Sequence, residues 1–109
     1  QHPEKLFILL TTPPLNAAEA DPAMAARGRR MAEWLLSEDF KRGLPNLYVF
    51  NLHGLLAEND PASPKYGTLR ADYRDGSDNH PNQQANQDIA PLLGNYILDT
   101  IQAFQTAQN

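Results

Sequence analysis

Two short runs of apolar residues predict β-strands. The first covers residues 6–11 and is followed by Pro13 and Pro14, and the second covers residues 47–52. Apolarity in both runs is continuous rather than alternating, which is typical of strands that are buried on both faces of a parallel sheet. We therefore expect two neighbouring parallel strands in the interior of an α/β domain.

The segment between these runs predicts an amphipathic helix. One apolar stripe recurs at three- and four-residue spacing, at Met24, Gly28, Met31 and Leu35. Asp21 followed by Pro22 is typical of an N-cap and a first helical position. We expect the helix to run from Asp21 to near Phe40, with Gly43 as its stop. A helix of this length between two strands is what a right-handed parallel crossover requires.

The second half of the chain predicts a long loop and a closing helix. Residues 57–79 are rich in Pro, Gly, Asp and Ser, and we interpret so long a loop as functional. From Pro81 onward apolar residues return at helical spacing, and Pro91 is expected to kink this helix or split it in two. Because two buried strands cannot complete a sheet, the chain is predicted to be half of a domain. A missing N-terminal half, a partner chain or a second copy would cover the strands.

Composition narrows the classes of function. The net charge is −4, and the acidic residues predominate in the second half, which argues against nucleic-acid binding. No apolar run approaches the roughly 20 residues of a membrane span. The chain has no cysteine, which excludes disulfides, thiolate nucleophiles and cysteine metal sites. We expect no cofactor and no metal site.

The concentrated polar chemistry lies in residues 72–82, which enter the closing helix. His80 could act as a general base if a carboxylate accepted its Nδ1 proton, and Asp78 and Asp75 are both close enough in sequence. The alternative is that these residues make turns, with Asn79 or Asn82 capping the helix beside a surface histidine.

Other side chains also have two interpretations. His53 follows the second predicted strand, and it is either a ligand or pocket wall or a histidine satisfied by backbone contacts. Tyr66 and Tyr73 either line a pocket or are exposed loop residues. None of the serines lies on the strand-to-helix turn that is typical of a nucleophile, and these serines are Ser37, Ser63 and Ser77.

These motifs together resemble the C-terminal half of the SGNH hydrolases, also called GDSL esterases. The resemblance covers essentially all of residues 1–109. It rests on the Asp-x-His-Pro-Asn run of residues 78–82, the double-proline turn after the first strand, and the Phe-Asn-Leu-His end of the second. It implies a three-layer α/β/α sandwich with a parallel, flavodoxin-like sheet. It also implies a Ser-His-Asp triad that cleaves carboxylic esters, with His80 as base and Asp78 as its orienting acid.

The sequence departs from the family pattern at two points. The aspartate of the family usually stands three residues before the histidine, where this chain has Ser77, so the choice between Asp78 and Asp75 stays open. The nucleophilic serine and the oxyanion hole belong to the N-terminal half of the family. They would come from that half or from a partner chain, acting on a small ester or acetylated carbohydrate. The alternatives are a non-catalytic α/β interaction module and an acyltransferase of the same fold.

Overall fold

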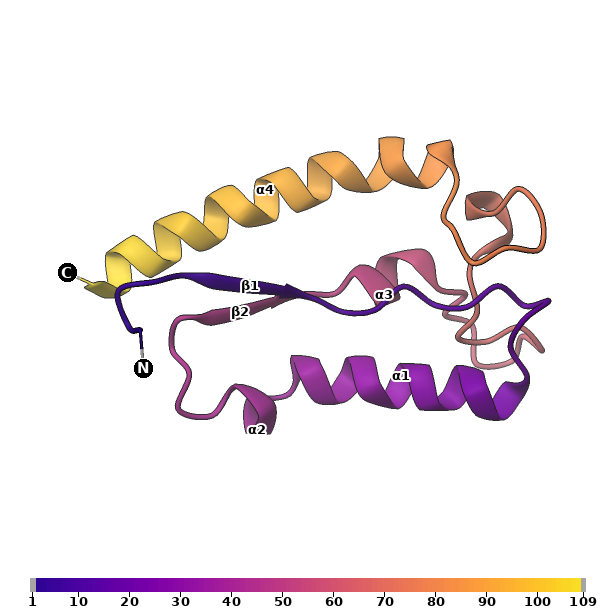
Figure 1. Ribbon diagram of the computed structural model, residues 1–109, viewed down its shortest axis with the longest axis horizontal. Coiled ribbons are helices and arrows are strands. Elements are labelled where there is room, and N and C mark those ends of the chain that lie inside the picture. The colour runs from indigo at the N-terminus through magenta and orange to yellow at the C-terminus, as the bar shows by residue number, and fades with distance from the viewer. Residues whose placement is uncertain (1, 109) are drawn as a thin grey trace.

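The computed structural model describes residues 2–108, which form a mixed α/β structure (Figure 1). Along the chain the elements are β1 (Phe7–Leu10), α1 (Pro22–Leu36), α2 (Glu38–Lys41), β2 (Leu47–Phe50), α3 (Leu52–Leu56), a 3₁₀ turn η1 (Ala71–Tyr73) and α4 (Gln83–Gln108). Helices α1 and α4 lie on opposite sides of the two strands (Figure 1).

The two strands pair in parallel, as the crossover length predicts. Phe7 lies opposite Leu47, and Leu10 lies opposite Phe50. Because the strands run in the same direction, their carboxyl ends lie at the same end of the sheet. The loops that follow β1 and β2 therefore start side by side.

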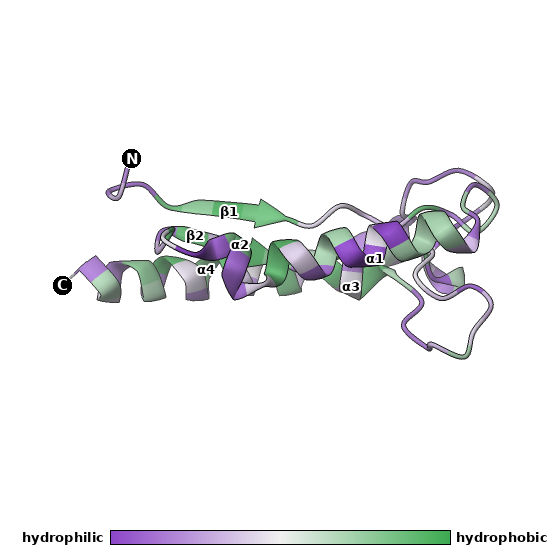
Figure 2. Cartoon of the chain, turned by 90° about the horizontal axis from the view of Figure 1, so that it is seen from below, coloured by the Kyte–Doolittle hydropathy of each residue, from purple (hydrophilic) through white to green (hydrophobic). Residues whose placement is uncertain are grey.

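Strand β1 is not buried on both faces, so that expectation was wrong for this strand. Phe7 is 48% exposed and Leu10 is 40% exposed, whereas Val49 and Phe50 of β2 are buried. Figure 2 shows the reason, since the helices lie over β2 and β1 stands to one side of them. In residues 2–108 the sheet has only two strands, so one edge of β1 has no hydrogen-bonded neighbour.

The crossover helix begins as predicted and ends early. The Asp21 carboxylate accepts a hydrogen bond from the Met24 amide at 2.8 Å, which makes Asp21 the N-cap of α1. Ser37 then separates α1 from α2, because its hydroxyl donates to the Trp34 carbonyl at 2.6 Å and accepts from the Phe40 amide at 3.2 Å. A serine hydroxyl competes in this way with the helical backbone pattern, and the apolar stripe alone does not reveal it.

The long loop is packed rather than loose, and it contributes to the core. Ala57 and Leu69 form an isolated antiparallel bridge, and both are 1% exposed. The core cluster joins β2, α3, this loop and the first half of α4 through Phe50, Leu56, Leu69, Tyr73, Ala85 and Ile89. Residues 52–56 form α3, although the sequence predicted Leu52 as the end of a strand and no helix here. The Asn51 side chain caps this helix by accepting from the Gly54 amide.

Helix α4 continues through Pro91 and is not split. A proline in a helix removes one backbone donor, and the flanking turns can compensate by packing. Here Ile89 is in the core cluster and Leu93 packs against it, so both sides of Pro91 are held by the same contacts. No helix in residues 2–108 combines the length and the apolarity that a membrane span needs.

Thr11 joins the carboxyl end of β1 to the start of α3. Its side chain is buried, and its hydroxyl accepts a hydrogen bond from the His53 amide at 2.8 Å. The same hydroxyl lies 3.3 Å from the Asn51 Oδ1 atom, to which it donates. One buried hydroxyl therefore satisfies backbone and side-chain groups that both follow β2.

We predict that Thr11→Val lowers the free energy of unfolding by about 1–3 kcal/mol, because valine keeps the shape and leaves the buried His53 amide without an acceptor. Urea denaturation measures this. The matched control is Thr12→Val at the exposed neighbouring position, for which we expect a change within about 0.5 kcal/mol. Equal effects at the two positions would contradict the role of the Thr11 hydroxyl.

Candidate functional site

The Asp78–His80 pair lies on an exposed loop before α4. The His80 side chain is 91% exposed and that of Asp78 is 76% exposed. The Asp78 Oδ1 atom accepts a hydrogen bond from the His80 backbone amide at 2.9 Å and lies 3.7 Å from His80 Nδ1. The second distance is longer than a hydrogen bond. The carboxylate is thus held beside the ring nitrogen that an orienting acid would contact.

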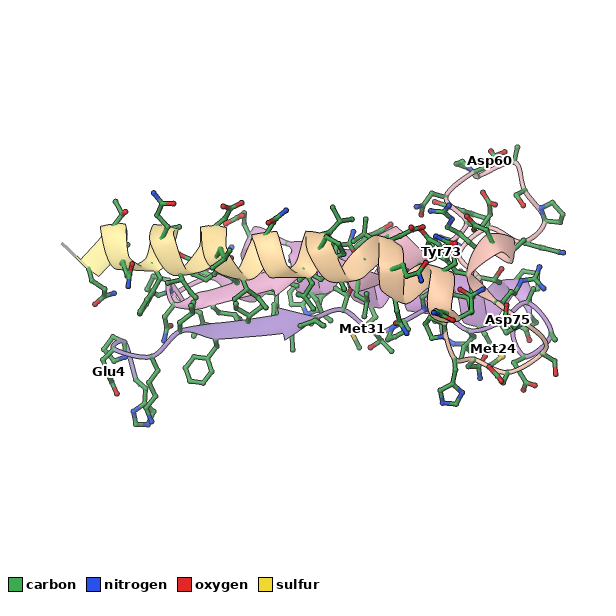
Figure 3. The ribbon with its side chains drawn as sticks, turned by 90° about the horizontal axis from the view of Figure 1, so that it is seen from above. Glu4, Met24, Met31, Asp60, Tyr73 and Asp75 are labelled. Carbon is green, nitrogen blue, oxygen red and sulfur yellow. The ribbon has the colours of Figure 1, made fainter. Side chains whose placement is uncertain are left out.

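Asp75, the other candidate acid, is engaged elsewhere. Its Oδ1 atom accepts from the Asn82 side-chain amide at 3.0 Å, and Asn82 Oδ1 in turn accepts from the Ala85 amide at 3.0 Å. Asn82 therefore caps α4, as the turn interpretation of this segment predicted. Figure 3 shows Asp75 among the loops beside the amino end of α4.

Asn16 binds the loop that carries Asp78 and His80, and the sequence analysis missed it. It is 0% exposed, although it lies in the loop after β1. Its Nδ2 atom donates to the carbonyls of Gly76 at 2.8 Å and Asp78 at 2.9 Å, and its backbone amide donates to Asn79 Oδ1 at 2.7 Å. The only sequence signal is its place just after a parallel strand, where functional residues of α/β folds gather.

His53 is a buried residue of α3. Its backbone amide is bound by the Thr11 hydroxyl, which agrees with the backbone-satisfied interpretation, while its ring Nε2 atom is buried without a hydrogen-bond partner. Burial lowers the pKa of His53 below its ordinary 6.5, the charge of Arg29 lowers it further, and Glu33 raises it. Burial therefore favours the neutral form of the ring.

Open cavities flank α1, and the two larger ones differ in their linings. One, of about 370 Å³, lies between the loop after β1 and α1, and it is lined by residues 12–15, by Met24 and Met31, and by His53. The other, of about 540 Å³, lies between α1 and the long loop, where the Arg29 guanidinium lies 3.8 Å from the centre of the Tyr66 ring. Neither cavity is lined by Asp78 or His80.

Tyr73 lines neither of these cavities. It is 5% exposed, and its hydroxyl donates to the Asp88 carboxylate at 2.8 Å, so it is a core residue. Within residues 2–108 no three His, Asp or Glu side chains are grouped so that they could hold a metal ion.

Ser37 and Ser63 are both engaged with residues other than His80. The Ser37 hydroxyl is bound at the junction of α1 and α2, and the Ser63 hydroxyl accepts from the Lys65 amide. For residues 2–108 the structure gives no hydrogen bond between His80 and any serine hydroxyl. In the described residues a carboxylate thus lies 3.7 Å from a ring nitrogen of an exposed histidine, and no hydrogen bond joins the two side chains.

No family model, no curated protein and no solved structure matches the chain. The likeness to SGNH hydrolases therefore rests on the residues quoted from the sequence.

We predict that His53 makes stability depend on pH. Because its folded pKa lies below the unfolded 6.5, the unfolded chain binds more protons at low pH. Above about pH 6.5 the ring is neutral in both states, and the contribution of His53 to the free energy of unfolding is fully present. As the pH falls toward the folded pKa, only the unfolded chain gains the proton, so the free energy of unfolding decreases with a slope of at most about 1.4 kcal/mol per pH unit. Denaturation between about pH 7.5 and 5.5 should show a smaller slope for His53→Gln. An unchanged slope would contradict this account.

Proposed function

We propose that this chain is the part of an SGNH-type serine esterase that supplies His80 as general base and Asp78 as its orienting acid. The observation that carries the proposal is the Asp78 carboxylate, held 3.7 Å from His80 Nδ1 by its bond to the His80 amide. Asp75 is bound to Asn82 instead, which supports Asp78 as the acid. The finer fold in this proposal is a three-layer α/β/α sandwich that another polypeptide completes.

The uncovered edge of β1 supports an incomplete domain. Phe7, Leu9 and Leu10 are 48%, 36% and 40% exposed, and strand edges normally carry a charge, a proline or a cover that blocks pairing. The strand Phe7–Leu10 has none of these within it. A complementing strand would pair with this edge and bury the apolar side chains. It would come from an N-terminal half or from a partner chain.

The open edge of β1 also suggests where the missing serine would lie. In open α/β sheets, ligands bind beyond the carboxyl ends of the strands. If the complementing strand were also parallel, its carboxyl end would lie at the end of the sheet where Asn16 binds the Asp78–His80 loop. A serine on the loop after that strand would lie at the same end of the sheet as the histidine (Figure 1).

The proposed reaction is two-step acyl transfer. His80 removes the serine proton through Nε2 while Asp78 stabilises the imidazolium at Nδ1, and the serine oxygen attacks the ester carbonyl. The alcohol leaves with the proton from His80, and water then releases the acid by the same route. Contacts between catalytic groups are often long in free proteins and shorten in the complex. The substrate class is a small carboxylic ester or an acetylated carbohydrate.

We predict that the chain alone hydrolyses no ester, because loss of the triad serine costs on the order of 10⁶ in rate. The assay uses a chromogenic acetate ester. Addition of the polypeptide that supplies the serine should restore turnover, and a serine-directed organophosphate should abolish it. Organophosphate-sensitive turnover by residues 1–109 alone would contradict the proposal. Complementation without turnover would favour the non-catalytic interaction module.

In the complemented enzyme we predict that His80→Ala removes nearly all activity. Asp78→Asn should lower kcat by up to roughly 10⁴, as loss of the orienting acid does in serine proteases. Asp75→Asn is the matched control, since this carboxylate faces Asn82, and it should change kcat little. If the Asp75 variant is the damaged one and Asp78→Asn is silent, the assignment of the acid is wrong.

A further inference from the structure

Asn16 uses every hydrogen-bonding group of its side chain in a fully buried position. Both donors of Nδ2 are bound to carbonyls, those of Gly76 and Asp78, which are 60 and 62 residues later in the chain. Its Oδ1 atom accepts from the Ala18 amide at 3.0 Å. A buried amide with complete partners fixes the backbone segments around it, because moving any of them would leave a polar group unsatisfied.

Asn82 closes the loop that Asn16 binds at its base, through hydrogen bonds to Asp72, Tyr73 and Asp75, and the tip of the loop is bound by Asn16. Residues 75–80 are exposed and contain no helix or strand, and Gly76 adds backbone freedom. For the described part of the chain, the hydrogen bonds that reach residues 76–79 from another element all come from Asn16. An exposed segment of this kind samples many conformations unless specific contacts restrict it.

We propose that Asn16 is a positioning residue for the His80 base, an inference that rests on the proposed function. Asn16 holds the Asp78 carbonyl, while the Asp78 carboxylate binds the His80 amide. Asp78 is thus held by two hydrogen bonds, one from Asn16 to its backbone carbonyl and one from the His80 amide to its carboxylate. The position of Asp78 beside His80 then depends on Asn16, although Asn16 contacts neither the His80 ring nor a substrate.

Asparagine meets the requirements of this position, which are two donors and one acceptor on a short side chain. Aspartate has the same size but cannot donate, so it would set a carboxylate against two carbonyl oxygens. Alanine would leave both carbonyls without their donor. Asn46 offers a matched control, because its Nδ2 atom likewise bridges two carbonyls, those of His2 at 2.9 Å and Lys5 at 2.8 Å. These residues flank the amino ends of β1 and β2, at the opposite end of the sheet (Figure 1).

The first test needs no activity and uses the chain by itself. NMR relaxation gives backbone order parameters for residues 76–80, which we expect near 0.85 in the wild type and below about 0.6 in Asn16→Asp. Asn46→Asp should leave them at the wild-type value. Unchanged order parameters in a folded Asn16→Asp chain would overturn the proposal.

A second variant covers failure of Asn16→Asp to fold. Asn79→Ala removes the contact to the Asn16 amide from the exposed side of the loop. It should keep the fold and lower the order parameters by a smaller amount. The positioning role would be overturned if Asn16→Asp did not fold and the order parameters of residues 76–80 were unchanged in Asn79→Ala. Asn16 would then have a purely structural role.

The second test measures kinetics in the complemented enzyme. Asn16→Asp should lower kcat by on the order of 10² with little change in KM, because a misplaced base slows the chemistry without removing a substrate contact. A loosened loop with unchanged kcat would overturn the positioning role. If the wild-type complement has no activity while the order parameters behave as stated, the proposed esterase fails and Asn16 still orders the loop.

Discussion

The parallel pairing of β1 with β2 sets where the polar residues of this chain can meet. Parallel strands end together, and backbone groups beyond the last ladder bond need new partners. The Thr11 hydroxyl is the acceptor for the His53 amide. Five residues later, the Asn16 side chain is the donor for the carbonyls of Gly76 and Asp78. An antiparallel pairing would send these segments to opposite ends of the sheet. The parallel direction of the strands is therefore the first requirement for the candidate site, because it brings these segments to the same end of the sheet.

The core is distributed unevenly around this pair. Phe50, Leu56 and Ile89 bind β2, α3 and α4 into one apolar cluster, whereas the side chains of β1 are largely exposed. Strand β1 is held by its backbone bonds to β2 and by the contacts of the loop after it. The segment around Asn16 is held by buried hydrogen bonds in addition to the apolar cluster.

The sequence predicts the features whose causes are local. The cap at Asp21 acts over three residues, and Asp78 lies two residues from His80, so both could be found from spacing. The parallel pairing follows from the length of the crossover. The contacts of Asn16 could not be found, because they join segments about 60 residues apart and have no periodic signal. The burial of β1 was mispredicted, because an apolar run shows that a strand favours burial but not whether this chain contains the elements that would cover it.

The separation between Asn16 and Asn79 also has a consequence for the order of folding. The bond between them closes a loop of 63 residues, and the entropy of that closure must be offset by contacts that already exist. Asn16 follows the amino-terminal strand and Asn79 precedes the closing helix, so the bond joins segments from the two ends of the chain. We therefore expect the candidate site to become ordered late as the chain folds and to open early when stability falls.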